Sequence, residues 1–171
     1  MLEKATGKNY EALIRKNIFE PAGMKDSGVL RTGQIIPQLA RGYQKQGGRL
    51  VPTELGVTVE ALDGAGTLFT TARDLWRFDR ALAAEKILPR KAQALMLSQQ
   101  VKGRFGYGWF LSEQGGKYFP WHEGSYRGHA AVFVRQVQRD EAIMILSNLQ
   151  DADVLELRTK VLRILKANTA P

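Results

Sequence analysis

The segment Trp121-His122-Glu123-Gly124-Ser125 holds residue types that could take part in chemistry. We expect it to join a strand to a turn, where the imidazole of His122 would lie at the edge of a cleft. Gly124 would let another backbone or a ligand approach closely, and the N–H of Ser125 would point outward as a hydrogen-bond donor to an oxyanion. On spacing alone, however, a single histidine is more often a structural residue with a local hydrogen bond.

Other candidate residues favour structural roles. His129 precedes five apolar residues, so we expect it to begin a buried strand and to hydrogen-bond locally. Tyr107 and Trp109 are aromatic residues of a kind that more often belongs to a core than to a substrate platform. Asp63-Gly64-Ala65-Gly66 is not followed by the Lys-Ser/Thr of a phosphate loop, and a tight turn is the better interpretation.

The serines lack the sequence context of a nucleophile. None is followed three residues later by lysine, and none lies in Gly-x-Ser-x-Gly. No tyrosine is followed two residues later by asparagine. Serine hydrolysis needs an activated hydroxyl, and no pattern in this sequence provides one for the five serines: Ser27, Ser98, Ser112, Ser125 and Ser147.

Composition narrows the classes of protein further. The 171 residues are 44% hydrophobic and 25% charged, which is typical of a folded globular domain with its own core. The absence of cysteine excludes disulfides, thiol catalysis and thiolate metal sites. Two histidines argue against a multi-histidine metal site. We therefore expect no metal and no cofactor.

The net charge of +8 could attract nucleic acid, anionic lipid or acidic substrates. No apolar run is long enough to span a membrane, and the first residues lack the apolar stretch of a signal peptide. The charge is scattered, and its densest stretch lies opposite apolar residues at helical spacing. We interpret that stretch as a solvated helix face and expect no nucleic-acid partner; it consists of Arg158, Lys160, Arg163 and Lys166.

Residues 1–103 are expected to form helices and loops. In Thr71-Ala72-Arg73-Asp74, the hydroxyl of Thr71 can cap a helix while Asp74 reaches back to the cap. The expected elements are helices at Met1–Ala5, Asn9–Pro21, Thr71–Leu82 and Pro89–Ser98, and a hairpin of Arg41–Gln46 and Arg49–Thr53 around Gly47-Gly48.

Residues 104–171 are expected to form a sheet and a last helix. Short connections make the sheet antiparallel, and two apolar runs suit its middle. The last helix starts at Asp151 or Asp153 and ends near Lys166. The expected fold class is α+β, with 1–103 and 104–171 as parts of one structural unit. The expected strands are Phe105–Leu111, Lys117–Glu123, His129–Val134 and Ala142–Leu146, with Arg139-Asp140 in a turn.

Several segments together carry a family resemblance. Ala5–Tyr10 followed by Ile18–Ser27 is similar to the pattern TGKSYxE…IFxPLGMxDT, with Ala22 where leucine is usual. In this order the segments resemble the serine β-lactamase and penicillin-binding-protein-like family, which includes class C β-lactamases, D-alanyl-D-alanine carboxypeptidases and esterases. Further matching segments are Ala40–Tyr43, Ala65–Leu75, Gly106–Trp109, His122–Gly124 and Ile145–Asn148.

The resemblance covers only the C-terminal part of that family and implies a partial β-lactamase/transpeptidase-like fold. It implies acyl transfer through a serine ester, with a small-molecule acyl substrate, and it places the nucleophile and base upstream in Ser-x-x-Lys and Tyr-x-Asn. By position, His122 would orient the substrate carboxylate or the catalytic tyrosine, and Ser125 would donate one oxyanion hydrogen bond. Gly124 would keep the strand edge open, and Tyr107 is a further candidate for substrate contact.

Glu123 stands where penicillin-recognising members carry a small threonine or serine, and its carboxylate should repel an anionic β-lactam. This repulsion favours an esterase or another hydrolase, rather than a β-lactamase, as the full-length protein to which this sequence corresponds. Without the nucleophile the covalent path is missing, so we expect the chain to be inactive alone. The alternative is a non-catalytic binding or scaffolding module derived from the same fold.

The resemblance also predicts a bare strand edge at Ala142–Leu146, because the family's N-terminal strands pair there. Exposed apolar edges invite pairing, so we expect self-association or binding of an N-terminal complement through this edge. Many relatives are exported to the periplasm or the extracellular space, but an export signal would lie upstream, so this sequence does not indicate the compartment of the parent protein.

Overall fold

A computed structural model describes residues 2–54, 59–99, 104–114, 117–137 and 140–167. Contacts divide the chain into two compact units, which are residues 1–37 with 55–111 and residues 38–54 with 112–171. Helices precede a four-stranded sheet, and a C-terminal helix packs on that sheet. The predicted α+β class is confirmed, while the division at residues 103 and 104 stays a prediction. No described helix has the length and hydropathy needed to cross a membrane.

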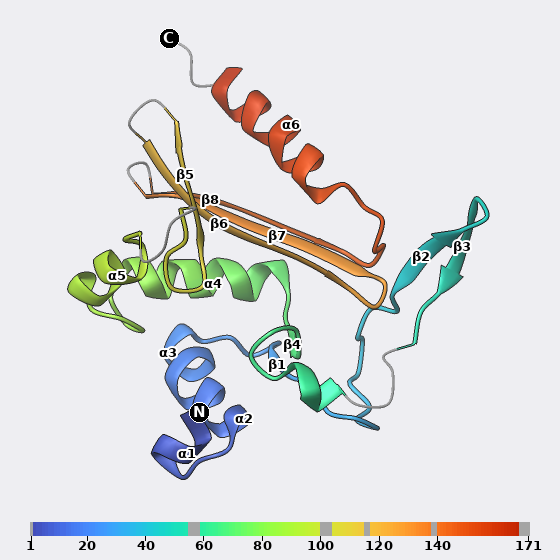
Figure 1. Cartoon of the computed structure of the whole chain (residues 1–171), viewed down its shortest axis with the longest axis horizontal. Coiled ribbons are helices and arrows are strands. Elements are labelled where there is room, and N and C mark those ends of the chain that lie inside the picture. Colours follow the sequence, from blue (N-terminus) through green and yellow to red (C-terminus); the bar gives the residue numbers. More distant parts are fainter. Residues whose placement is uncertain (1, 55–58, 100–103, 115–116, 138–139, 168–171) are drawn as a thin grey trace. The chain divides into compact units, whose positions relative to one another are not determined.

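The first unit contains mostly helices (Figure 1). Hydrogen bonds mark the end of the first helix and the start of the second: the N–H of Gly7 donates to the carbonyl of Glu3 at 2.8 Å, and the side chain of Asn9 accepts from the N–H of Ala12 at 2.8 Å. The elements are α1 (Leu2–Thr6), α2 (Tyr10–Ile14), a π-helical turn η1 (Arg15–Phe19), α3 (Glu20–Ala22), β1 (Gly28–Val29), a 3-10 turn η2 (Val59–Leu62), β4 (Leu68–Phe69), α4 (Ala72–Ala83) and α5 (Arg90–Met96).

Asp74, in the first turn of α4, joins this helix to the loop before β1. The hydroxyl of Thr71 accepts from the N–H of Asp74 at 3.1 Å, so the predicted helix start is confirmed. The carboxylate does not reach back to the cap as expected. It is 0% exposed and accepts hydrogen bonds of 2.7 Å from the N–H of Asp26, the hydroxyl of Ser27 and the guanidinium of Arg77. The carboxylate therefore bonds to a loop that is distant in the sequence instead of to the N-cap of its own helix.

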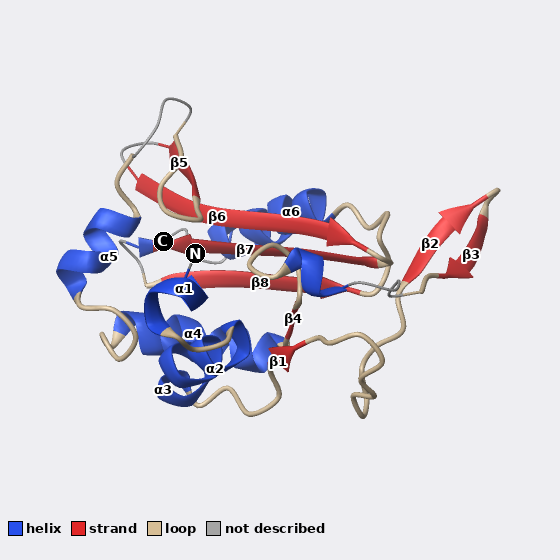
Figure 2. Ribbon diagram, turned by 60° about the horizontal axis from the view of Figure 1, so that its bottom comes forward, coloured by secondary structure: helices blue, strands red, loops and turns tan. Residues whose placement is uncertain are grey.

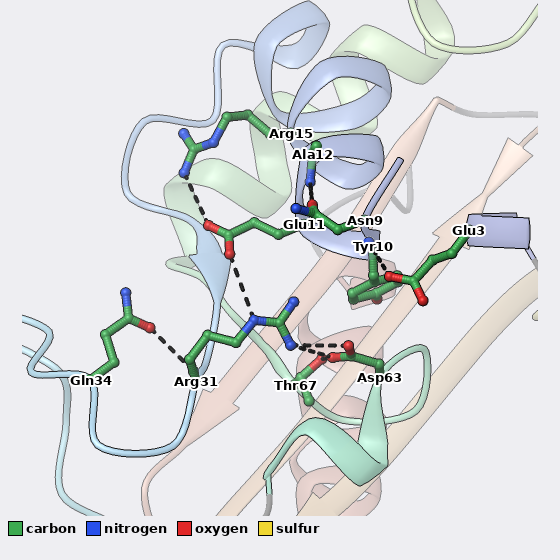
Figure 3. A network of polar contacts seen from close by, with 10 residues as sticks. All are labelled: Glu3, Asn9, Tyr10, Glu11, Ala12, Arg15, Arg31, Gln34, Asp63 and Thr67. Atoms are coloured by element: carbon green, nitrogen blue, oxygen red, sulfur yellow. Dashed lines mark hydrogen bonds and ion pairs between the residues drawn. The ribbon is translucent and has the colours of Figure 1, made fainter. Parts of the chain in front are cut away.

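Arg31 stabilises the turn that precedes β4 (Figure 3). Its Nη1 donates to both carboxylate oxygens of Asp63 at 3.0 Å, and its Nε lies 3.6 Å from Oε2 of Glu11. Asp63 also accepts from the hydroxyl of Thr67 at 3.0 Å. The tight turn predicted at Asp63–Gly66 is present, because the N–H groups of Ala65 and Gly66 both donate to the carbonyl of Leu62.

The alternating aromatic residues before the sheet form a turn rather than a strand. The predicted strand Phe105–Leu111 is wrong over its first half, since β5 runs from Phe110 to Gln114. The N–H of Gly106 donates to the carbonyl of Trp109 at 2.9 Å, and Gly108 has a φ of +74°. Glycine is well suited to that conformation, so the two glycines outweigh the period-two pattern.

The main sheet of the second unit has the order β5-β6-β7-β8 and is antiparallel between β6 and β7 and between β7 and β8. Strand β6 (Lys117–Tyr126) is longer than predicted. Strand β7 (His129–Gln136) lies in the middle of the sheet, as predicted, and buries Ala130, Val132 and Val134. The mid-sheet position expected for β8 (Glu141–Ser147) is wrong, because β8 is the last strand in the order and its residues are half-buried or exposed. Arg139 of the predicted turn lies outside the described residues.

Helix α6 (Val154–Ala167) lies along one face of this sheet (Figure 2). It starts after Asp153, whose side chain accepts from the N–H of Glu156 at 2.7 Å. Arg158 is not simply solvated as expected, because its guanidinium lies over the ring of Trp121, 5.3 Å from the centroid. Apolar packing supplies the rest of the contact between α6 and the sheet. The buried core comprises Ala130, Val132, Val134 and Val154, and the half-buried side chains packed against it are Phe119, Trp121, Ile145, Ala152 and Leu155.

A hairpin of β2 (Tyr43–Gln46) and β3 (Arg49–Pro52) lies beside the end of the sheet where β6 turns into β7 (Figure 1). The backbone N–H of Tyr43 lies 3.2 Å from the carbonyl of Gly128 and 2.9 Å from that of Asn148. The first bond attaches the start of the hairpin to the β6–β7 turn, and the second attaches it to the residue that follows β8 (Glu141–Ser147).

Side chains complete this attachment at the carbonyl of Arg127. The hydroxyl of Thr53 donates to it at 2.7 Å, and Nδ1 of His129 lies 3.0 Å from it. The other ring nitrogen of His129 lies 3.0 Å from the carbonyl of Ala40. His129 thus begins a strand and bonds locally, as predicted. We call this set of contacts between residues 40–53 and the β6–β7 turn the turn junction.

Replacing Asp74 with asparagine should lower the free energy of unfolding by about 1–3 kcal/mol, since a buried acceptor loses its charge. Burial alone would raise the pKa of Asp74, but hydrogen bonds from Ser27, Arg77 and the N–H of Asp26 hold that pKa below its ordinary value. The charge therefore stabilises the fold fully above pH ~3.9 and loses its effect as the pH falls through the lower folded-state pKa.

Urea denaturation at several pH values checks this. The difference between wild type and Asp74→Asn should be constant near neutrality and shrink below about pH 4. Asp26→Asn removes an exposed carboxylate nearby and should change stability by less than about 0.5 kcal/mol. A difference that does not vary with pH would contradict the assignment.

Gly42→Ala should destabilise the second unit by about 1–3 kcal/mol through overpacking at the turn junction. A Cβ at Gly42 would collide with the carbonyl oxygen of Arg127 and lie 2.7 Å from Cε1 of His129. Gly124→Ala is the matched control, because a Cβ there has no atom within 4 Å. In urea denaturation followed by tryptophan fluorescence, Gly42→Ala alone should lower the unfolding midpoint. Equal midpoints for the two variants would refute the role of the turn junction.

Candidate functional site

The predicted site residues His122–Ser125 lie on the second half of β6, next to a two-residue turn. Tyr126 pairs with His129 across Arg127-Gly128, whose φ angles are +47° and +83°. Two consecutive positive φ angles define the type I′ turn that suits the twist of a tight hairpin. The register of the whole β6–β7 ladder is therefore set by this turn.

That register fixes which backbone groups of β6 point away from β7. The pair that flanks a two-residue hairpin turn is hydrogen-bonded, and hydrogen-bonded pairs alternate with non-hydrogen-bonded pairs along an antiparallel ladder. Gly124, paired with Ala131, belongs to the bonded set together with Tyr126. The N–H groups of Glu123 and Ser125 consequently point away from β7, toward the opposite edge of β6.

Part of that edge is not covered by another strand of the sheet. Strand β5 has five residues, whereas β6 has ten, and the two strands follow each other in the chain with only residues 115 and 116 between them. Strand β5 can therefore pair only with the half of β6 that begins at Lys117. Among the described strands, none lies along the edge from Glu123 to Ser125.

Side chains alternate between the two faces of β6. Glu123 and Ser125 pair with Val132 and Ala130, which are core residues under α6. His122 and Gly124 therefore lie on the opposite face. His122 is exposed, and its Nδ1 lies 2.7 Å from the carbonyl of Glu123.

The hydroxyl of Ser125 donates to the carbonyl of Gln150 at 3.2 Å, so it has a structural partner, while the backbone N–H is directed to the uncovered edge. This arrangement can present an imidazole and a backbone donor to an extended ligand placed along β6. A carbonyl oxygen of such a ligand could accept from that donor.

Tyr107 belongs to the first unit, whereas His122–Ser125 belong to the second. Tyr107 is 59% exposed in the turn before β5, so the core position expected for it is wrong. Its backbone N–H donates to the carbonyl of Met96 at 2.9 Å. The side chain is thus available at a surface of the first unit.

Tyr126 and Arg127 are exposed side chains immediately beyond the His122–Ser125 edge. The guanidinium of Arg127 lies 5.4 Å from the centroid of the Tyr126 ring, and its Nε donates to the hydroxyl of Tyr126 at 3.1 Å. No sequence pattern marks this pair; its position directly after the His-x-Gly segment was the available signal. Among the residues that the structure describes, no group of three or more His, Asp or Glu side chains could hold a metal ion.

Comparisons with known proteins identify several relatives of this chain. Among curated proteins, the chain is 26% identical over 174 residues to PbpX of Bacillus subtilis (strain 168), which is named as a penicillin-binding protein. It is 27% identical over 169 residues to penicillin-binding protein 4* of the same organism. Among solved structures, D-amino acid amidase from Ochrobactrum anthropi SV3 has a TM-score of 0.81 and 27% identity, and FmtA from Staphylococcus aureus shares the fold with a TM-score of 0.81 at 18% identity.

The match spans nearly all of this chain but only part of each relative. It covers 96% of the chain and 41% of PbpX, and 99% of the chain and 54% of the amidase. The chain therefore corresponds to about half of the fold seen in these relatives. The family model described as Beta-lactamase matches residues 1–166, and the chain belongs to the beta-lactamase family.

Proposed function

We propose that this chain is the C-terminal part of a serine hydrolase related to β-lactamases and supplies one wall of an acyl-transfer site. The observation that carries the proposal is the uncovered edge of β6, where the N–H of Ser125 points outward beside the exposed His122. Membership of the beta-lactamase family supports it.

Each residue of the edge has a separate role in this proposal. The N–H of Ser125 donates to the oxyanion of a tetrahedral intermediate, where a pre-positioned donor is most effective. His122 orients the substrate carboxylate or a catalytic tyrosine supplied from outside this sequence. The space beside Gly124 is open, because a Cβ built there would meet no atom within 4 Å. Since glycine has no Cβ, this space is left for the substrate backbone.

The proposed substrates are esters, amides or β-lactams that react through a serine acyl-enzyme. The exposed carboxylate of Glu123, next to the oxyanion donor, disfavours anionic β-lactams because like charges repel. Neutral esters and amides are therefore favoured. The relatives' names agree with an acyl substrate, since they include penicillin-binding proteins and a D-amino acid amidase.

The chain alone lacks the covalent half of this chemistry. The hydroxyls of Ser27 and Ser125 donate to Asp74 and to the carbonyl of Gln150, respectively, so both have structural partners. No serine in the sequence lies in Ser-x-x-Lys, and no tyrosine lies in Tyr-x-Asn. Oxyanion donors without a nucleophile do not replace the acyl-enzyme path.

We also propose that the outer edge of β8 accepts a further strand, either from a second copy of the chain or from an N-terminal complement. In the described part of the chain, β8 has one neighbouring strand, β7. An exposed strand edge presents unpaired backbone donors and acceptors that favour such pairing.

Incubation with a fluorescent penicillin and with p-nitrophenyl esters should give neither a covalent adduct nor turnover above the buffer rate. Intact-protein mass spectrometry detects an adduct independently of fluorescence. A stoichiometric adduct would contradict the proposed inactivity and would identify a nucleophile among the serines of this chain.

Ligand binding at the β6 edge is tested by titrating D-phenylalanine amide into ¹⁵N-labelled protein. Amide shifts should concentrate at Glu123 and Ser125. Ser125→Pro removes the outward N–H and should weaken binding about fivefold or more, as expected for the loss of one hydrogen bond. Ser125→Ala keeps this N–H and loses only the hydroxyl, so it should bind like the wild type. Equal binding by both variants would refute the role of this N–H.

A further inference from the structure

The guanidinium of Arg127 is held in place beside the His122–Ser125 segment. Its Nε donates to the hydroxyl of Tyr126 at 3.1 Å, and the group lies 5.4 Å from the centroid of the Tyr126 ring. Its Nη1 lies 3.4 Å from the carbonyl of Glu54. These contacts limit the freedom of a long side chain before any ligand binds, so less conformational entropy is lost on binding.

The positive charge of Arg127 has no acidic partner in the described part of the chain. The side chain is exposed, and the contacts of its guanidinium there are a phenol, an aromatic ring and a backbone carbonyl, which are all neutral. Nη2 has no hydrogen-bond partner among the described residues. A planar guanidinium with donors to spare matches the geometry of a carboxylate, so this group is suited to bind one.

The backbone of Arg127 adds a second observation. Its φ of +47° lies in the left-handed region, at a turn position where asparagine, aspartate or glycine is preferred. An arginine there costs backbone energy, because its Cβ crowds the main chain. Strain of this kind clusters at sites that bind ligands. The strained residue here lies two positions after Ser125.

The pair of Tyr126 and Arg127 lies beyond an open position on β6. His122, Gly124 and Tyr126 alternate along the strand and therefore share the face opposite α6. His122 is exposed, Tyr126 is 42% exposed, and the position between them carries no side chain. A ligand group placed over Gly124 would thus have the imidazole on one side and the Tyr126 ring with its guanidinium on the other.

We propose that Arg127 determines substrate specificity by binding a carboxylate on the acyl portion of the substrate. This inference rests on the proposed function, in which the N–H of Ser125 binds the scissile carbonyl and His122 serves the substrate's carboxylate end or a catalytic tyrosine. Arg127 lies on the other side of Ser125, so it faces the acyl portion. Two residues of an extended strand span about 7 Å, which sets the separation between the two groups of the substrate.

The preferred substrates are then neutral at the scissile bond and acidic at a distance from it. Glu123 lies four residues from Arg127, which is roughly 13 Å along an extended strand and more than the Debye length of about 8 Å at physiological ionic strength. Repulsion by Glu123 therefore acts near the oxyanion donor, while attraction by Arg127 acts at the far end. Amides and esters of amino acids that carry a dicarboxylic acyl group, such as succinyl, have this distribution of charge.

A pair of ligands that differ only in one charge tests the inference. The first is N-succinyl-D-phenylalanine amide, and the second is the analogue in which a carboxamide replaces the terminal carboxylate. In titrations of ¹⁵N-labelled protein, both should shift the amides of Glu123 and Ser125. The wild type should bind the carboxylate ligand about three- to tenfold more tightly, and sodium chloride should reduce this preference.

Two variants separate the guanidinium from the turn and from net charge. Arg127→Asn introduces a residue that suits the turn, so the unfolding midpoint should stay the same or rise while the preference for the carboxylate is lost. Affinity for the neutral ligand should not change. Arg49→Gln removes the same charge from an exposed position of β3 and should keep the preference.

Equal affinities of the wild type for the two ligands would overturn this inference, as would a preference that survives Arg127→Asn. A preference lost in both variants would assign it to net charge and overturn it as well. In these three cases shifts at Ser125 would still support the proposed function. If neither ligand shifts the amides of Glu123 and Ser125, the proposed function fails together with this inference.

Discussion

The hydrogen-bond register between β6 and β7 is the constraint on which the functional geometry of the second unit depends. It is set by the type I′ turn at Arg127-Gly128, and the turn junction holds that turn through Tyr43, Thr53 and His129. A shift by one residue would exchange the two faces of β6 and the two directions of its backbone groups. Residues 40–53 therefore serve the candidate site although none of them belongs to it.

Hydrogen-bonded and non-hydrogen-bonded pairs alternate along the strands, and this alternation determines which backbone groups point outward at both edges of the described sheet. Starting from the Tyr126–His129 pair, it directs the N–H of Ser125 away from β7, and it directs the backbone of Met144 away from β7 on the other side. The first edge suits a small extended ligand, because a short stretch of β6 beyond β5 is uncovered. The second edge runs along β8, which has one neighbouring strand, β7, in the described part of the chain.

Local patterns predicted the elements that local forces specify. Asn9, Thr71 and Asp153 cap helices as their side chains and positions indicate, and Gly47-Gly48 marks a hairpin. Two predictions failed where long-range contacts compete with local preferences: the carboxylate of Asp74 bonds to Ser27 instead of its own cap, and Arg158 covers Trp121. A third failed for a local reason, because the aromatic alternation around Tyr107 is interrupted by a glycine turn.

The sequence by itself determined the α+β class, the family and the lack of a Ser-x-x-Lys nucleophile, because these are carried by periodicity, by segment order and by residue identity. Only the tertiary structure decided that Glu123 and Ser125 direct their N–H groups to an uncovered edge, and that β8 is the last strand of the described sheet. The direction of a backbone group in a sheet depends on its register with a neighbouring strand, and that register is set by contacts between residues far apart in the chain.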